Sequence, residues 1–82
     1  MFVYMNGTFV EAERASISPF DHGFLYGLGA FETFRTYGGQ PFLLEEHLER
    51  LNAALRELQI ERRFSGKEVL GITEELIKLN GL

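Results

Sequence analysis

The 82 residues suffice for one domain, which we expect to span residues 1–82, and a domain of this size can bury only a thin core. The net charge of −4 argues against broad nucleic-acid binding, and the absence of cysteine excludes disulfides and thiolate metal sites. No apolar run approaches the roughly 20 residues of a membrane span, and the N-terminus has no secretory signal pattern, so we expect a cytoplasmic protein without membrane contact.

The first predicted element is a hairpin. Asn6-Gly7 separates the largely apolar residues 2–5 and 8–10, and both turn residues tolerate the positive φ that a two-residue type I′ turn requires. Residues 20–29 then combine three glycines with several large apolar side chains. Glycines weaken helices and strands, whereas so many aromatic residues are unusual in a mobile loop. We therefore expect a packed, irregular segment whose backbone passes close to another surface.

A second hairpin is predicted from Ala30 onward. Residues 30–37 alternate and are rich in Phe and Thr, which is typical of a strand, and Gly38-Gly39 forms the turn to a return strand that begins at residues 40–42. The alternation assigns to one face Ala30, Glu32, Phe34 and Thr36, and to the other Phe31, Thr33, Arg35 and Tyr37.

Two amphipathic helices follow. Residues 43–58 carry leucines at spacings of three and four, which form one apolar stripe. Ser65 and Glu68 form a capping-box pattern that opens a second helix, and Asn80-Gly81 ends it. Strands in a run followed by helices predict a two-layer α+β fold, with an antiparallel sheet of about four strands (two hairpins) and two helices packed on one face. Hydrophobic residues make up 45% of the chain, more than a thin core can use, so we expect part of the surface to meet a partner.

Arg50 lies beside the leucine stripe, and two interpretations stay open for its side chain. It can form a surface ion pair with Glu46 one turn earlier, or it can clamp an anion, because guanidinium offers a fork of donors that fits phosphate. His47, one turn before Arg50, is most simply a partly buried histidine bonded to backbone. The other histidine, His22, has no ligand spacing to it, so no metal site is expected.

Glu32, Tyr26 and Phe31 are further candidates. A carboxylate on an otherwise apolar face must be paired, exposed or near a site, and Arg35, which is close in sequence, belongs to the opposite face. Tyr26 and Phe31 can be core residues or can line a pocket. The sequence has neither the Gly-x-Ser-x-Gly elbow of serine hydrolases nor the glycine pattern of a dinucleotide site or a P-loop. Taken singly, none of these residues identifies a function.

The ordered set of motifs is more specific than its members. The runs Ser18–Gly27 and Gly29–Thr33, followed by His47-x-x-Arg50-Leu51, resemble the N-terminal domain of class IV (fold-type IV) pyridoxal-phosphate-dependent aminotransferases and their relatives. The resemblance covers essentially the whole chain. Within the family, the runs Ile17–Gly27 and Phe31–Arg35 are most similar to bacterial 4-amino-4-deoxychorismate lyases, which form p-aminobenzoate for folate with release of pyruvate. Branched-chain and D-amino-acid aminotransferases are the alternative within the family, and a non-catalytic association domain on the same scaffold is a third hypothesis.

The resemblance implies a role for several residues. Arg50 would hold the phosphate of pyridoxal 5′-phosphate, with His47 and Glu32 in support. The residues implied for the substrate pocket, which would take a small molecule with carboxylates, are Tyr26, Phe31 and Thr33.

The resemblance also implies what this chain lacks. In that family the lysine that bonds the cofactor lies in a second domain, and the site forms between the domains of a homodimer. This chain has only Lys67 and Lys78, which fit surface charges on the second helix, so we assign no catalytic residue. We expect that the C-terminal domain is absent, and that the chain alone is inactive and does not bind the cofactor.

Overall fold

The N-terminal hairpin forms as its turn sequence predicts. The computed structural model describes residues 1–82, and in it β1 (Phe2–Met5) pairs antiparallel with β2 (Thr8–Glu11). Asn6 and Gly7 have φ values of 49° and 85°, the positive values that a type I′ turn requires. On one face, the rings of Tyr4 and Phe9 pack edge to face with their centroids 5.0 Å apart.

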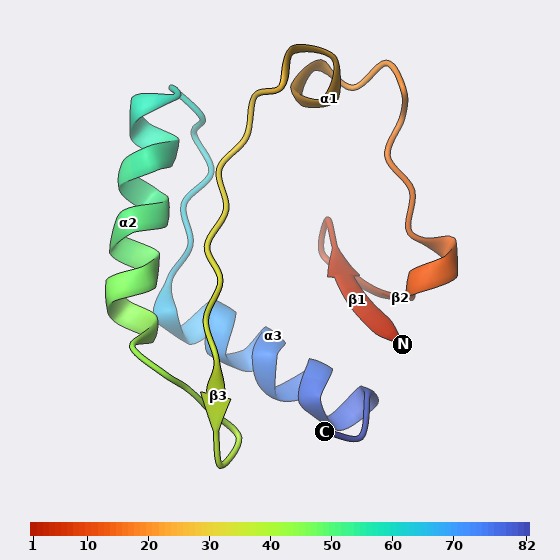
Figure 1. Cartoon of the computed structure of the whole chain (residues 1–82), viewed down its shortest axis with the longest axis vertical. Coiled ribbons are helices and arrows are strands. Elements are labelled where there is room, and N and C mark those ends of the chain that lie inside the picture. The colour runs from red at the N-terminus through yellow and green to blue at the C-terminus, as the bar shows by residue number, and fades with distance from the viewer.

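The glycine-rich segment contains a short helix that the sequence analysis did not predict. After η1 (Ala12–Arg14), the chain arches away from the hairpin to α1 (His22–Tyr26), as Figure 1 shows. The Asp21 side chain accepts a hydrogen bond from the Phe24 amide at 3.1 Å, and Gly27 ends the helix with a φ of 66°. The prediction that this segment packs is wrong for the chain by itself, because its large apolar side chains are exposed.

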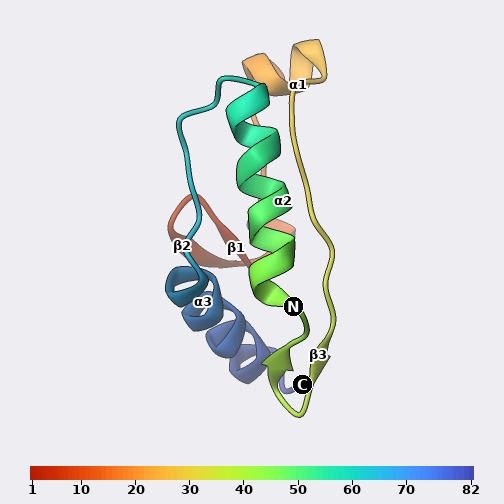
Figure 2. The same cartoon turned by 90° about the vertical axis from the view of Figure 1, so that its left-hand side faces the viewer.

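The strand predicted at residues 30–37 is wrong in its extent. Only β3 (Thr36–Tyr37) pairs, with β4 (Gln40–Pro41), across the Gly38-Gly39 turn. Residues 28–35 instead run alongside a helix (Figures 1 and 2). The helix makes its backbone hydrogen bonds internally, so it offers no strand edge with which the segment could pair. The predicted alternation holds nonetheless: the half-buried positions are 30, 32 and 34, and the exposed ones are 31, 33 and 35.

Both predicted helices are present. They are α2 (Leu44–Glu57) and α3 (Gly66–Leu79), and the α2 stripe contributes the two buried residues of the chain, Leu48 and Leu55. Ser65 caps α3 by accepting a hydrogen bond from the Glu68 amide at 3.1 Å, and Asn80-Gly81 ends that helix as predicted. The Glu68 carboxylate does not complete the predicted capping box, because it pairs with Arg62 at 2.7 Å.

Two asparagines join segments that are distant in sequence. The Asn52 amide accepts from the Phe64 N–H and donates to the Phe64 carbonyl, both at 2.9 Å, which ties the α2–α3 connection to α2. The Asn80 amide bonds Phe2 in the same two ways, at 2.6 and 3.0 Å, which ties the end of α3 to β1. The α+β class and the two hairpins are therefore confirmed, and the hairpins form two separate two-stranded sheets.

The molecule is open for its size. Its radius of gyration is 13.8 Å, whereas a compact domain of this length has about 12 Å. Its accessible surface is 6561 Å², against about 5,000 Å² for a folded monomer of this mass. Much of the excess is apolar and lies on residues 17–31, on the arch in Figure 1. No helix combines the length and apolar composition that a transmembrane span requires.

Candidate functional site

The candidate site forms where residues 28–35 meet one side of α2. His47 and Arg50 are three residues apart on α2, so their side chains leave the helix on the same side, next to the leucine stripe. The alternation of the extended segment turns Glu32 and Phe34 toward that side, and the rings of Phe34 and His47 have their centroids 5.7 Å apart. The helix period and the extended period together bring one carboxylate against two basic side chains.

Glu32 binds Arg50 side-on. Its Oε1 accepts a hydrogen bond from the Arg50 Nε at 2.6 Å, and its Oε2 accepts a longer one from Nη2 at 3.3 Å. Charge-assisted pairs with two parallel bonds are among the strongest and most directional hydrogen bonds in proteins. The third guanidinium nitrogen, Nη1, has no hydrogen-bond partner within the chain.

The same carboxylate also bears on which ring nitrogen of His47 carries a proton. The His47 Nδ1 lies 3.1 Å from Glu32 Oε2 and also 3.1 Å from Arg50 Nη2. An ionised carboxylate can only accept a hydrogen bond and a guanidinium can only donate one. Nδ1 either carries a proton and donates or lacks one and accepts, so it cannot hydrogen-bond both groups. We assign the proton to Nδ1, which donates to Glu32, and the approach of Nη2 is then a contact between two donors.

The electrostatics follow from these contacts. The hydrogen bond from Arg50, and secondarily that from His47, lowers the pKa of Glu32 to about 2. The bond to Glu32 raises the pKa of Arg50, with a smaller Coulombic contribution from Glu46. Glu32 and Arg50 are therefore both ionised over the whole physiological pH range.

The partners of Arg50 and His47 differ from the simplest sequence expectations. Arg50 does not hydrogen-bond Glu46 but Glu32, and His47 is half-buried as predicted but bonds this carboxylate and not backbone. The sequence contained a signal for this arrangement, because Glu32 is the one carboxylate on the otherwise apolar face of its segment.

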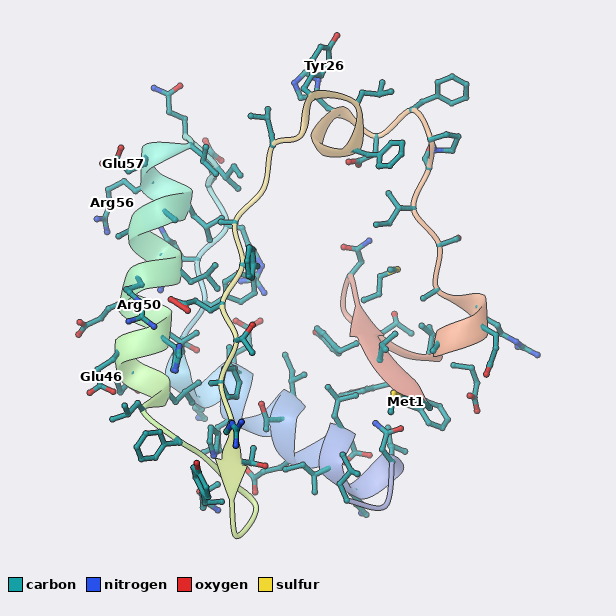
Figure 3. All side chains as sticks on the ribbon, in the orientation of Figure 1. Met1, Tyr26, Glu46, Arg50, Arg56 and Glu57 are labelled. Atoms are coloured by element: carbon teal, nitrogen blue, oxygen red, sulfur yellow. The ribbon has the colours of Figure 1, made fainter.

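The structure does not bring the three predicted pocket residues to this cluster. Tyr26 lies at the tip of α1, pointing away from the rest of the chain, and stacks on His22 at 4.7 Å between ring centroids, whereas Arg50 lies on the middle of α2 (Figure 3). Phe31 is 88% exposed and Thr33 is exposed on the same outward face. None of the three lines a hollow within the chain, and their contact with substrate stays a prediction.

Glu32 and His47 border an apolar hollow of about 440 Å³ between α2, α3 and the hairpin. Its lining consists of Tyr4, Glu32, Phe34, His47, Leu48, Leu51, Phe64, Val69 and Ile72. Lys67 and Lys78 are exposed on α3 and do not line it. No group of three or more His, Cys, Asp or Glu side chains is placed to hold a metal ion. The cluster can thus bind and orient an anion, but it offers no amine nucleophile.

Comparison with known proteins identifies the family. Residues 29–82 match the family model for amino-transferase class IV. Aminodeoxychorismate lyase of Bacillus subtilis is 55% identical over 98% of this chain, and a putative branched-chain-amino-acid aminotransferase of Methanocaldococcus jannaschii is 40% identical over all of it. D-alanine aminotransferase of Staphylococcus haemolyticus is 32% identical over 98% of the chain. The chain spans only 27–28% of the length of these relatives. From the match over more than half of its residues, the chain belongs to the class IV aminotransferase family.

Proposed function

We propose that this chain forms the N-terminal domain of a pyridoxal-phosphate-dependent 4-amino-4-deoxychorismate lyase, which releases pyruvate and leaves p-aminobenzoate for folate synthesis. The observation that carries the proposal is the 55% identity to the Bacillus subtilis aminodeoxychorismate lyase, compared with 40% and 32% to the aminotransferases. The alignment extends over nearly the whole chain, so it covers the glycine-rich arch as well as the helices.

The donor set at Arg50 fits a cofactor phosphate. Nη1 is without a partner and the Arg50 side chain is 65% exposed, so a phosphate can approach the guanidinium. In our proposal, Arg50 donates hydrogen bonds to that phosphate, while Phe31 and Thr33, next to Glu32 on the outward face, bound the substrate side. Pyridoxal phosphate supplies an electron sink for bond breaking at the carbon that bears the amine. This chain would bind and orient, and the nucleophilic lysine would come from another part of the enzyme.

The shape of the chain supports a role as one part of a larger site. Its surface exceeds that of a folded monomer of its mass by about 1,500 Å², roughly twice the area of about 800 Å² that one partner contributes to a standard protein interface. The exposed apolar side chains of residues 17–31 are the kind of surface that another domain or subunit covers. We propose that the complete enzyme is a homodimer in which this surface is buried.

The test is made on the complete encoded polypeptide, purified and supplied with pyridoxal phosphate. With 4-amino-4-deoxychorismate as the only substrate, we expect p-aminobenzoate and pyruvate in equal amounts, without any 2-oxo acid as amino-group acceptor. Arg50→Ala should weaken cofactor binding at least tenfold, because the charge-assisted bonds to phosphate are lost. Arg56→Ala is the matched control, since Arg56 is an exposed arginine on the same helix (Figure 3) and should leave cofactor binding unchanged.

A second candidate is an aminotransferase for branched-chain or D-amino acids, favoured by the 40% identity over the full chain to the Methanocaldococcus jannaschii protein. Turnover that requires a 2-oxo acid and exchanges the amino group, with no p-aminobenzoate formed, would select this candidate over the lyase. Absence of both activities in a polypeptide that still self-associates would favour a non-catalytic association domain.

A further inference from the structure

We propose that Glu32 is a positioning residue for a phosphate-monoester site: it holds the Arg50 guanidinium by its side edge and so presents the outer edge to the phosphate. The inference deepens the proposed function and rests on it, because it takes Arg50 as the residue that meets the phosphate. Two sets of contacts support the inference: those of the Arg50 guanidinium and those of the segment that contains Glu32.

The first step is the division of the guanidinium into two edges. Guanidinium has five N–H donors in a fixed plane, and Glu32 engages the Nε–Nη2 edge. On the Nη1–Nη2 edge, Nη1 has no partner and Nη2 lies 3.1 Å from His47 Nδ1, and this edge has the fork geometry that phosphate oxygens prefer. Because Glu32 lies on the adjacent side edge, which shares Nη2, it restrains the long arginine side chain and leaves Nη1 free for an anion. The Arg50 side chain is 65% exposed and that of Glu32 is 17% exposed, so the carboxylate that holds the arginine is largely covered, whereas the arginine stays accessible to an anion.

The second step is that Glu32 also anchors its own segment. Between residues 29 and 34, every hydrogen bond of the structure is made by the Glu32 carboxylate, to His47 and to Arg50. Those bonds are therefore the polar tethers of the extended segment to α2, alongside which it runs (Figure 2). Phe31 and Thr33 flank Glu32 and point to the other side, so the contact that orients the phosphate donor also orients the residues of the implied substrate wall.

The test compares Glu32→Gln with Glu46→Gln in the complete encoded polypeptide. Each variant removes one negative charge near Arg50, but Glu46 makes no hydrogen bond to it and acts only through its charge. Dissociation constants are measured calorimetrically for inorganic phosphate, for pyridoxal phosphate and for pyridoxal. We expect Glu32→Gln to bind phosphate and pyridoxal phosphate about 3- to 10-fold more weakly, since the amide can replace only part of the carboxylate's bonds. Pyridoxal, which has no phosphate, should bind all proteins equally, and Glu46→Gln should bind phosphate equally or slightly more tightly.

Three outcomes would overturn the proposal. If Glu32→Gln binds phosphate as tightly as the wild type, or more tightly, Glu32 is a competitor or a bystander and does not position Arg50. If pyridoxal affinity falls in parallel, the variant has a general folding defect, and the phosphate-specific role is rejected. In an Arg50→Lys background, Glu32→Gln should have no further effect, and a persisting effect would likewise reject the proposal. A wild type without lyase activity whose phosphate affinity still depends on Glu32 would reject the proposed reaction and leave this inference standing.

Discussion

Two regions of this chain are similarly rich in large apolar residues and differ in what those residues contact. In the region formed by the hairpin, α2 and α3, the leucine stripe buries Leu48 and Leu55 to 5% and 6% exposure. In the arch of residues 17–31, Phe20 and Phe31 are 83% and 88% exposed. Apolar content alone therefore does not produce a core, because a side chain is buried only where the chain supplies a facing surface.

The two regions are also held differently. The helix and hairpin region is closed by the reciprocal amide bonds of Asn52 and Asn80, which join residues up to 78 positions apart. The arch has only local hydrogen bonds, such as the Asp21 cap and the bond from the Phe20 amide to the Ser18 hydroxyl, and just beyond its end Glu32 contacts α2. Long-range tethers thus coincide with the buried leucines, and the region without them is the region that we propose another domain or subunit covers.

The largest effect is expected from truncating the stripe. Leu48→Ala should lower the free energy of unfolding of the 82-residue chain by about 2–5 kcal/mol, because it removes buried methyl groups and leaves a cavity. Phe31→Ala deletes a larger side chain but should change this free energy by no more than about 0.5 kcal/mol, since the ring is exposed. Urea denaturation followed by circular dichroism measures both.

The same pair of variants tests the contrast between the two regions. Equal destabilisation of the isolated chain by both would mean that the arch packs on the helices in solution, and the contrast between the two regions would fail. In the complete polypeptide, Phe31→Ala should become clearly more destabilising than in the isolated chain if a second domain or subunit covers the arch.

The next effect is expected at the Asn80 tether. Asn80→Asp removes the donor to the Phe2 carbonyl and places a carboxylate beside that oxygen, so we expect a loss of about 1–3 kcal/mol. Asn6→Asp makes the same chemical change at an exposed turn position that has no side-chain hydrogen bond, and it should change stability by less than about 0.5 kcal/mol. Thermal unfolding of both variants tests this, and equal shifts would contradict the importance of the tether.

These contacts show which parts of the molecule could be predicted from sequence. The Asn6-Gly7 turn, the cap at Ser65 and both helices depend on residues within a few positions of each other, and they were predicted correctly. The pairing predicted for residues 30–37 depends on a partner strand that the chain does not supply. The local alternation therefore predicted which side chains are half-buried, but it did not predict the extent of strand pairing.

The candidate site shows the same division between local and distant contacts. Arg50 and His47 were identified as candidates, but their bonds to Glu32 join residues 18 and 15 positions apart, and helix spacing pointed to Glu46 instead. The short helix α1 was missed because its two ends are determined by Asp21 and Gly27, with too few residues between them to show a helical period. The placement of Tyr26, Phe31 and Thr33 at a substrate stays a prediction, since the three residues line no hollow within this chain.

A smaller effect is expected at the hairpin turn. Gly7→Ala places a Cβ on a residue with a φ of 85°, which should cost about 1–2 kcal/mol, because a side chain clashes with the backbone in the left-handed region. Gly29→Ala, at the end of the arch, meets open space with no such backbone requirement, and it should be neutral within about 0.5 kcal/mol. The denaturation midpoints of both variants measure these changes. A loss of stability in Gly29→Ala as large as that in Gly7→Ala would reveal packing around the arch.

The smallest effect is expected from acid, and it tests the hydrogen bonds by which Glu32 joins the end of the arch to α2. The pKa of Glu32 is lowered to about 2 from 4.5, chiefly by the hydrogen bond from Arg50. A lowered folded-state pKa means that the ion pair contributes its full stability above pH 4.5 and loses that contribution as the pH falls from 4.5 through about 2. The Glu32 carboxyl carbon, followed by NMR, should therefore titrate with a midpoint near 2, and Arg50→Gln should move that midpoint upward toward 4.5. A wild-type midpoint close to 4.5 would mean that Glu32 does not hold Arg50 in solution, and the arch would then have no polar tether to α2 at its C-terminal end.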